Sequence, residues 1–351
     1  MTELLLSKSP ILSSLGLRSI DDVYNDCIEK ADTLNVATGF ITNQSIAELN
    51  HILSFHDFNF SINLFIGMHY LDGFTQLQYN SVCKLDELLR SRNNGKVFLS
   101  KNAFFHGKMY SFEKHGTSIA SFVGSSNLGS FVGSSTDLLE SDIYFTEDSA
   151  AMISENICKI INLLGTPLID IPKITQFKAP EEKLFTDNQN VKKIKNDDVA
   201  ELSRNRIGKV LRIPLKTEGK SNLNTYFGAG KIKGKYSKRN WYEVELILSV
   251  KLTNRDILPW VDCGDKKKTC EIMVVTPDGY EFECSCQGDY GKNFRSSKDL
   301  AILGRWIKGS MEQKGALTPG EPVTEEVLNK FGFHLICLQK TSFNKWFMWF
   351  E

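Results

Sequence analysis

Five polar residues in the first half of the chain have the types and the spacing that suit chemistry at a phosphodiester. They are His106, Lys108, Ser126, Asn127 and Glu140. One residue separates His106 from Lys108, so both side chains point to the same face of an extended segment. Ser126 and Asn127 belong to a Gly-Ser-Ser-Asn turn after a strand-like run, where backbone N–H groups can bind an anion. Glu140 comes thirteen residues after Asn127, just before another strand-like run.

Together these residue types supply what phosphodiester cleavage needs. The His106 imidazole can attack phosphorus and form a covalent phosphohistidine. Cationic and amide donors such as Lys108 and Asn127 can hold the equatorial oxygens as charge builds up. A carboxylate at Glu140, bound to the far ring nitrogen, would set the tautomer and orientation of the imidazole. Because the set lacks a cluster of acidic residues suited to Mg²⁺, we predict cleavage without a metal or any other cofactor.

This set of residues resembles the motif of the phospholipase D superfamily, which is His-x-Lys, four residues, Asp, and then Gly-Ser-x-Asn. The sequence departs from the motif in two ways. Glu113 stands where the family has Asp, and the stretch from Lys108 to Gly124 is longer than usual. The extra length fits a looser hairpin through residues 114–117. The acid at the position of Glu113 is usually structural in this family, so its replacement casts little doubt on catalysis.

Active sites of that superfamily combine two motifs, with one histidine as nucleophile and the other as general acid for the leaving oxygen. This chain holds one motif, because no lysine stands two positions after any of its other histidines. Those are His51, His56, His69, His115 and His334. We therefore predict a homodimer whose two-fold axis passes through the active site and supplies the second motif.

The residues around the motif alternate between strand and helix patterns, which predicts an α/β layered domain with a mixed sheet. Strands are expected at 35–41, 60–67, 97–99, 108–113, 118–124 and 142–145, and helices at 20–30, 79–92 and 149–164. A proline-punctuated, lysine-rich stretch then follows without clear periodicity. It predicts three parts: a catalytic and dimerisation domain at 1–166, a linker at 167–200 and a second domain at 201–351.

The second domain is predicted to be mainly β, a small closed or half-closed barrel. Short strands are expected at 209–215, 242–250, 271–275, 280–286, 334–340 and 345–350, with a turn at 277–279 and helices near 300–309 and 324–331. Its cysteine cluster fits no familiar zinc spacing, and we expect small core residues there more than a metal site. The cluster comprises Cys263, Cys270, Cys284 and Cys286.

Charge is distributed unevenly although the net charge is zero. Residues 1–180 carry 13 Lys and Arg against 19 Asp and Glu, whereas residues 181–351 carry 29 against 23. From Arg204 to Arg239 there are eleven basic residues and a single acid, Glu218. A solvated charged face would explain such a run. Because Asn, Gly, Tyr and Phe are mixed with the basic residues, a surface that contacts phosphates and bases explains it better.

Two polar arms next to strands are the candidate DNA-reading segments. Arg reads guanine, Asn and Gln read adenine, Asp can accept from cytosine, and Lys mainly neutralises phosphate. With Arg212, the first arm offers Asn222, Asn224, Tyr226, Lys231, Lys233, Lys235, Lys238 and Arg239. The second arm offers Gln287, Asp289, Lys292, Asn293, Arg295, Ser296 and Ser297. Ordinary hydrophilic loops remain the alternative interpretation, more so for the second arm.

Across nearly its whole length the chain resembles the NgoFVII/NgoAVII group of restriction endonucleases. The resemblance rests on the catalytic motif, the linker and a C-terminal stretch that begins with residues 303–306 and ends with residues 323–332. It implies a C-terminal pseudobarrel similar to the plant B-three (B3) DNA-binding domain. It also implies a type II site-specific deoxyribonuclease that cuts double-stranded DNA at a fixed distance from a short GC-containing site. Some relatives work with a helicase-like ATPase partner.

Two other functions remain open. A lipid-directed phospholipase D would be expected to hold two motifs in one chain, and membrane-binding elements. A non-catalytic, site-specific DNA-binding protein would keep a vestigial phospholipase D domain. No apolar run approaches the ~20 residues of a membrane span, and an acidic residue stands where a signal peptide would carry basic ones. We therefore expect a soluble, cytoplasmic protein with no membrane partner.

Overall fold

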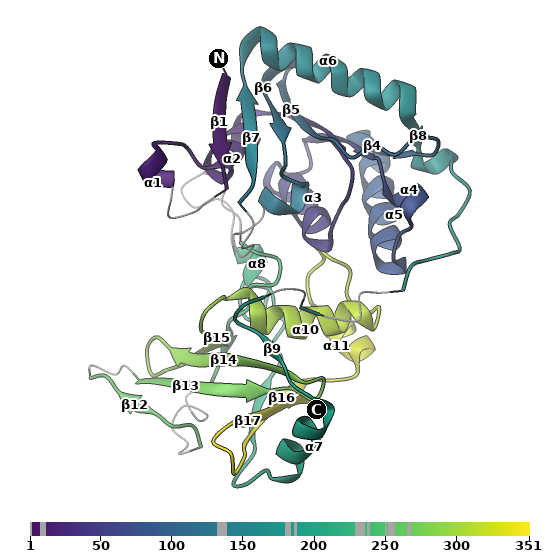
Figure 1. Cartoon of the computed structure of the whole chain (residues 1–351). Helices are drawn as coiled ribbons and strands as arrows, with labels where there is room; N and C mark the ends of the chain where they lie inside the picture. The colour runs from purple at the N-terminus through teal and green to yellow at the C-terminus, as the bar shows by residue number, and fades with distance from the viewer. Residues whose placement is uncertain are drawn as a thin grey trace. The chain divides into compact units, whose positions relative to one another are not determined.

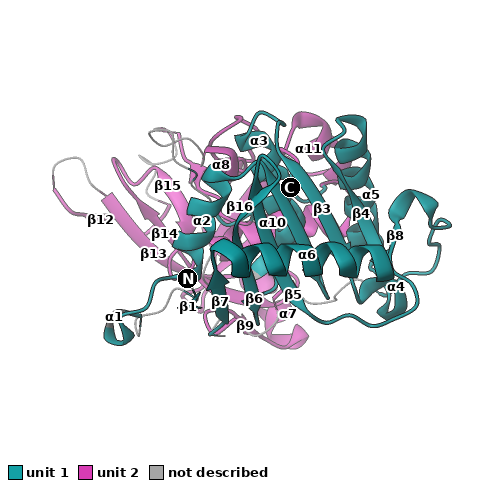
Figure 2. Cartoon of the chain, turned by 90° about the horizontal axis from the view of Figure 1, so that it is seen from above, with its two compact units in different colours: residues 1–180, 230–241, 318–320 teal, residues 181–229, 242–317, 321–351 magenta. Residues whose placement is uncertain are grey.

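The computed structural model describes most of the chain. The described ranges are 2–7, 12–131, 139–179, 184–185, 188–228, 236, 239–249, 251, 257–264 and 268–351. They fold into two compact units, shown in separate colours in Figure 2. Unit 1 comprises residues 1–180, 230–241 and 318–320, and unit 2 comprises residues 181–229, 242–317 and 321–351.

Unit 1 is built on an eight-stranded mixed sheet of order β1-β7-β6-β5-β2-β3-β4-β8. Its strands are β1 (Thr2–Leu6), β2 (Thr33–Thr38), β3 (Ser61–Ile66), β4 (Gly95–Ser100), β5 (Lys108–Lys114), β6 (Thr117–Gly124), β7 (Ser141–Phe145) and β8 (Gly165–Pro167). Strands β2, β3 and β4 pair in parallel, and the other pairs are antiparallel. The predicted α/β layered domain with a mixed sheet is confirmed.

Helices cover both faces of this sheet (Figure 1). On one face lie α2 (Ile20–Lys30), α3 (Asn43–Phe55) and α5 (Gln76–Ser91), and α6 (Glu147–Leu164) crosses the other face. Side chains of β2 alternate between the two faces, and both faces are apolar. Leu34 and Val36 enter the core beneath α2, α3 and α5, whereas Ala37 packs with α6. Short helices α1 (Leu12–Leu15), α4 (His69–Asp72), η1 (Leu128–Phe131) and η2 (Leu168–Asp170) complete the unit.

Two threonine caps place helices α3 and α5 at one edge of the sheet. The side chain of Thr42 accepts from the amide of Ser45, and Thr75 accepts from the amide of Gln78. In each capping box the third helical residue bonds back to the threonine amide, so two backbone donors are satisfied at the helix start. The loop between β2 and α3 is short, whereas the connection between β3 and α5 includes the short helix α4.

Unit 2 contains a sheet of order β10-β16-β17-β13-β14-β15-β11, with β12 paired to β13 and β9 paired to β14. Its strands are β9 (Lys192–Lys193), β10 (Leu211–Pro214), β11 (Leu246–Ile247), β12 (Val261–Asp262), β13 (Lys268–Val275), β14 (Tyr280–Gln287), β15 (Asn293–Ser296), β16 (Leu335–Lys340) and β17 (Trp346–Phe350). The sheet forms a nearly closed barrel, which confirms the predicted β-pseudobarrel. The predicted strand 242–250 is shorter than expected, and its last residue lies outside the described ranges.

Helices support this barrel at several points: α7 (Asn196–Arg204), α8 (Thr225–Gly228), α10 (Ala301–Gln313) and α11 (Glu325–Phe331). In α10, the ring of Trp306 stacks on Phe350 of β17 with centroids 4.1 Å apart. Gly304 of the same helix faces the carbonyl of Tyr242 so closely that any Cβ would overlap it. Only glycine therefore permits this approach of the helix.

The segment expected to be a linker contributes elements to both units. On its unit 1 side, β8 pairs with β4, and Leu168 and Ile171 are buried in the core. On its unit 2 side, β9 pairs with β14, and α7 buries Val199 and Leu202 against the barrel. Within the described ranges, no helix combines the length and the apolar character that crossing a membrane requires.

Candidate active site

The predicted catalytic residues lie at one edge of the unit 1 sheet. Lys108 begins β5, and His106 precedes it by two residues. Strand β6 ends directly before Ser125, and β7 begins directly after Glu140. Because β5 pairs with β6 and β6 pairs with β7, both antiparallel, these three strand ends are neighbours. The sheet topology therefore brings together residues that are up to 34 positions apart in the chain.

His106 and Lys108 are in direct contact. The Lys108 Nζ atom lies 3.4 Å from Nε2 of His106 and donates a 3.0 Å hydrogen bond to the His106 carbonyl. Lys108 is buried while the His106 side chain is exposed. An ammonium group can only donate, so its contact favours the tautomer with the lone pair on Nε2 and the proton on Nδ1. That tautomer presents Nε2 as a nucleophile.

Close backbone packing holds the segment that carries His106. The Phe105 amide donates to Gly67 O at 3.1 Å, and the Gly39 amide donates to Gly107 O at 3.1 Å. A Cβ at Gly67 would overlap the Phe105 backbone, and a Cβ at Gly39 would lie 3.1 Å from the Cα of His106. The Phe40 ring meets the imidazole edge to face, with centroids 5.5 Å apart. The two glycines thus allow the loops after β2 and β3 to pack closely against the backbone of residues 105–107.

Ser126 is buried beneath the site and does not line it. It is 1% exposed, its hydroxyl donates to Oδ2 of Asp142, and its carbonyl accepts a 2.7 Å hydrogen bond from the Tyr110 hydroxyl. Burial raises the pKa of the Asp142 carboxyl above its ordinary value, and the hydrogen bonds from Ser126 oppose that rise. The side chain of Ser126, which was predicted to be a catalytic group, is therefore directed to Asp142 inside the turn, whereas its neighbour Ser125 is exposed.

Ser125 is exposed and contacts the candidate carboxylate. Its hydroxyl donates to Glu140 Oε2 at 2.5 Å and accepts from the Ser141 amide at 3.0 Å. The Glu140 backbone is in turn held by Ser7, whose hydroxyl accepts its amide at 3.0 Å. Asn127 follows in the same turn, and its amide oxygen is buried with no hydrogen-bond partner among the described residues. Unsatisfied polar atoms of this kind often belong to functional sites.

Four of the predicted DNA-contacting residues are buried in unit 2. Asn222 bonds to Glu218 and to the Ile247 amide, and Asn224 bonds through both amide atoms to the backbone of Val323. The others are Tyr226, which is 1% exposed, and Ser296, which is 0% exposed. The side chains of these four residues therefore pack inside unit 2.

The second arm is the turn of a β-hairpin between β14 and β15, with Gly288, Asp289, Tyr290 and Lys292 exposed. At its base, Arg295 Nη2 donates to Oε1 of Gln287 at 2.5 Å, and Arg295 Nη1 lies 3.6 Å from Oε1 of Glu245. These two contacts hold the guanidinium in one orientation while leaving it partly exposed. Glu245 was missed by the sequence interpretation, because it lies outside both arms and acts only through Arg295.

The remaining predicted arm residues have varied settings. Asn293 and Ser297 are half-buried in the same hairpin region. Arg212 is exposed and forms an ion pair with Glu351 at 2.6 Å, and Arg239 is exposed. Four of the predicted phosphate contacts lie outside the described residues: Lys231, Lys233, Lys235 and Lys238.

One tyrosine inside the basic run is anchored in unit 1. The Tyr236 hydroxyl donates to Oε1 of Glu48 at 2.7 Å, and its amide donates to Oε1 of Glu29 at 2.5 Å. Its ring packs against His51 and Phe55. Sequence reasoning did not single out this residue, because it stands in a run dominated by lysine.

Two family models match the chain. The model for the NgoFVII restriction endonuclease N-terminal PLD domain (phospholipase D) matches residues 18–165, and the model for the NgoFVII C-terminal B3-like DNA-binding domain matches residues 203–342. The chain belongs to the NgoFVII restriction endonuclease family. The sheet edge that carries His106 is therefore part of the phospholipase D domain of a restriction endonuclease family, and the arm hairpin is part of its B3-like DNA-binding domain.

Several solved structures are similar to this NgoFVII-family chain over about half its length. NucT from Helicobacter pylori is 15% identical, with coverage of 47% of this chain and 100% of that one, at a TM-score of 0.31. Nuc, a phospholipase D family member from Salmonella typhimurium, is 14% identical, with coverages of 48% and 98% and a TM-score of 0.31. Polyphosphate kinase from Porphyromonas gingivalis is 11% identical, with coverages of 47% and 23% and a TM-score of 0.30. A search of curated protein sequences found no match.

Glu113, which departs from the phospholipase D motif, has structural contacts in this NgoFVII-family protein. Its Oε1 accepts from Asn35 at 2.9 Å and from Ser154 of α6 at 2.6 Å. The carboxylate thus ties β5 to β2 and to the helix that covers them. These contacts are structural, and they lie at the opposite end of β5 from Lys108.

The cysteine cluster forms part of the B3-like barrel. Cys270, Cys284 and Cys286 are buried on β13 and β14, where Cys270 pairs across the strands with Cys286, and Cys263 is exposed. In the described part of the chain, no three His, Cys, Asp or Glu side chains are grouped as a metal site would require.

Proposed function

We propose that this NgoFVII-family protein is a type II restriction endonuclease that cleaves double-stranded DNA near a short GC-containing site through a phosphohistidine. The contact between Lys108 Nζ and Nε2 of His106, at 3.4 Å on an exposed sheet edge, carries this proposal. The contact supports the proposal because one phosphate group could meet both the imidazole and the ammonium group.

In the proposed first step, His106 Nε2 attacks phosphorus and the P–O bond to the leaving deoxyribose oxygen breaks. Lys108 and the Asn127 amide stabilise the charge on the equatorial oxygens. Glu140, held by Ser125, would accept the Nδ1 proton in a hydrogen bond and so stabilise the imidazolium-like ring. In the second step, water attacks phosphorus, the P–N bond breaks, and the free imidazole is restored. None of these steps requires a metal.

The leaving oxygen needs a proton, and the described motif offers one histidine for two tasks. We propose that a homodimer formed through the N-terminal domain, residues 1–166, brings a second copy of the motif to the same site. Its histidine would protonate the leaving oxygen and then activate the water. A helicase-like ATPase remains a possible further partner. Action on foreign DNA would place the protein in the cytoplasm.

Recognition is assigned to the B3-like domain. We propose that the exposed part of the second arm, with Arg295 held by Gln287 and Glu245, reads base edges in the major groove. The exposed arginine Arg239 and the lysines of the first arm would bind phosphates and set the register on the duplex.

Incubation of DNA of known sequence with the protein in EDTA tests this function. We expect discrete double-strand fragments whose ends lie at a constant distance from one short sequence. His106→Ala should abolish cleavage and leave specific binding intact. His115→Ala is a matched control, because that exposed histidine follows the opposite end of β5. Specific binding without cleavage by the unmodified protein would support the vestigial alternative instead, and cleavage of phospholipid but not DNA would support the lipase.

A further inference from the structure

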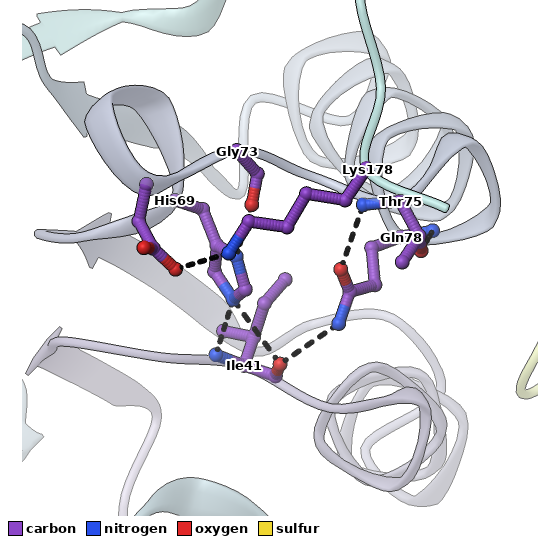
Figure 3. Close-up of polar contacts among 7 residues, drawn as sticks. Ile41, His69, Gly73, Thr75, Gln78 and Lys178 are labelled. Carbon is purple, nitrogen blue, oxygen red and sulfur yellow. Dashed lines mark hydrogen bonds and ion pairs between the residues drawn. The ribbon is translucent and has the colours of Figure 1, made fainter. Parts of the chain in front are cut away.

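A buried histidine outside the catalytic motif joins the loop after β2 to the loop after β3 (Figure 3). His69 begins α4 and is 6% exposed. Its Nε2 lies 3.1 Å from the Ile41 amide nitrogen and 3.3 Å from Ile41 O, and its Nδ1 lies 3.3 Å from Gly73 O. The neutral tautomer with its proton on Nδ1 donates to Gly73 O and accepts from the Ile41 amide, which is the shorter of the two Nε2 contacts.

The residue next to Ile41 reaches the nucleophile. Phe40 meets the His69 ring edge to face at 5.2 Å between centroids, and it meets the His106 ring at 5.5 Å with an interplanar angle of 75°. The backbone reinforces this arrangement, since the Met68 amide donates to Gly39 O at 3.0 Å. A single aromatic side chain therefore contacts both the buried histidine and the catalytic one.

We propose that His69 is a positioning residue for the nucleophile. Its ring fixes the loop at residues 39–42, and through Phe40 it holds the His106 imidazole in the orientation in which Nε2 faces Lys108. This inference rests on the proposed function, because it assigns to His69 a share in the cleavage step and none in DNA binding.

The surroundings of His69 favour its neutral form. Burial lowers the pKa of His69, and the backbone acceptors Gly73 and Ile41 and the Asp72 carboxylate oppose this effect. The charged groups that face the ring are Asp72 and Lys178, which form an ion pair at 2.5 Å, and the ring of Phe74 stacks on the imidazole with centroids 4.8 Å apart. Gln78 holds the other side of the Ile41 peptide, with Nε2 3.5 Å from its carbonyl (Figure 3).

Protonation of His69 would disrupt this arrangement. A proton on Nε2 would end the hydrogen bond from the Ile41 amide and direct Nε2 to Ile41 O, 3.3 Å away. That exchange would shift the loop that carries Phe40 against His106. A positioning role therefore predicts that cleavage depends on the protonation state of His69.

The test compares two substitutions at one position. His69→Leu fills the space without polar atoms, whereas His69→Gln can accept from the Ile41 amide and donate to Gly73 O. In single-turnover cleavage with enzyme in excess, we expect His69→Leu to be slower by on the order of 10- to 100-fold, the range expected for a misplaced nucleophile. We expect His69→Gln to recover most of the rate and to lose one titration from the acid limb of the pH profile. Site-specific DNA binding should be unchanged in both.

A matched control separates positioning from folding. The ring of His56 also packs against a phenylalanine, Phe60, and bonds to a backbone carbonyl, Ile28 O, but His56 follows the last residue of α3 and lies away from the edge that carries His106. His56→Leu should lower the midpoint of thermal unfolding to a similar degree and leave the cleavage step unaltered.

A double-mutant cycle with Phe40→Leu tests the route from His69 to the nucleophile. We expect the effects of Phe40→Leu and His69→Leu on the cleavage rate to be non-additive, because both break the same connection. Additive effects, or an unchanged rate and pH profile in His69→Leu, would overturn the proposal. Failure of the unmodified protein to cut DNA in EDTA would instead reject the proposed function, so the two failures are distinguishable.

Discussion

The hydroxyl of Ser126 donates a hydrogen bond to the buried carboxylate of Asp142, and this contact joins the turn at residues 125–127 to strand β7. The Ser126 amide also lies 3.4 Å from Oδ1 of Asp142. Gly124, just before the turn, packs so closely on the same carboxylate that a Cβ there would overlap it. Asp142 thus fixes the position of the turn that carries Ser125 and Asn127 relative to β7.

Asp142→Asn tests this role. The variant keeps the shape of the side chain but loses acceptor capacity, and it sets an amide NH₂ against one of the Ser126 donors. We expect the free energy of unfolding to fall by about 1–3 kcal/mol and the single-turnover cleavage rate to fall with it, while DNA affinity is unchanged. Denaturant titration, cleavage and binding measure the three quantities. A stable variant with the normal cleavage rate would remove Asp142 from the site.

The buried carboxyl of Asp142 should also make the free energy of unfolding depend on pH. Its folded-state pKa is raised above the ordinary value of 3.8 by burial, so the folded protein binds its proton more tightly than the unfolded chain. This contribution to the free energy of unfolding is fully present below the ordinary value and is lost as the pH rises through the raised pKa. Asp142→Asn removes the contribution, and the difference between the two pH–stability curves measures it.

Ser125→Ala and Ser126→Ala should separate catalysis from folding. Ser125 is exposed and holds Glu140, so its loss should slow cleavage with little change in the free energy of unfolding. Ser126 is buried, so its loss should cost on the order of 1 kcal/mol of stability, as for other buried hydrogen bonds. Parallel denaturation and cleavage assays measure both effects. If Ser125→Ala cleaves at the normal rate, Glu140 does not depend on this contact.

The choice between these two serines shows where sequence reasoning reaches its limit. Alternation predicts the facing of residues within a strand, but β6 ends at Gly124 and the turn follows no such rule. Which serine points inward is decided by Asp142, a residue of the next strand. The site was predictable as a group of residues at adjacent strand ends, whereas the assignment within the turn required tertiary contacts.

Among the helices of unit 1 as well, some could be predicted from the sequence pattern and others could not. Helix α2 was predicted with its observed bounds, because Ser19 caps it and its apolar residues keep a helical period. Helix α3 was missed because polar residues, including Glu48 and His51, are buried along it and blur that period. In unit 2, Tyr242 and Val244 look like part of a strand, but Gly304 of α10 packs against the Tyr242 carbonyl and the Val244 side chain at this point.

Arg295→Ala tests base reading by the second arm. If the guanidinium that Gln287 and Glu245 orient contacts a guanine, its removal should cost about 1–3 kcal/mol of binding and relax the preference at one base pair. Competition binding with single-substituted sites measures the preference. Arg295→Lys keeps the charge without the planar fork, so it should show the same loss of preference. An equal loss of affinity on every sequence would assign Arg295 to a phosphate.

The buried Lys308 of α10 should make the stability of unit 2 depend on pH. It is 0% exposed, and burial lowers its pKa from the ordinary 10.5 to about 7, with Glu312 and Glu243 opposing the shift. Between these two values the unfolded chain binds more protons than the folded protein. The free energy of unfolding therefore rises with pH across this window, and the stabilising contribution is lost as the pH falls through about 7.

Lys308→Met keeps an unbranched side chain and removes the charge. We expect the rise in the free energy of unfolding between about pH 7 and about pH 10 to disappear. At neutral pH the variant should be at least as stable as the unmodified protein, because a buried charge is replaced by an apolar group that packs similarly. Lys298→Met is the control, since Lys298 is 64% exposed and pairs with Glu283 at 3.7 Å. The control should keep the slope, and a slope that persists in Lys308→Met would assign the pH dependence to groups other than Lys308.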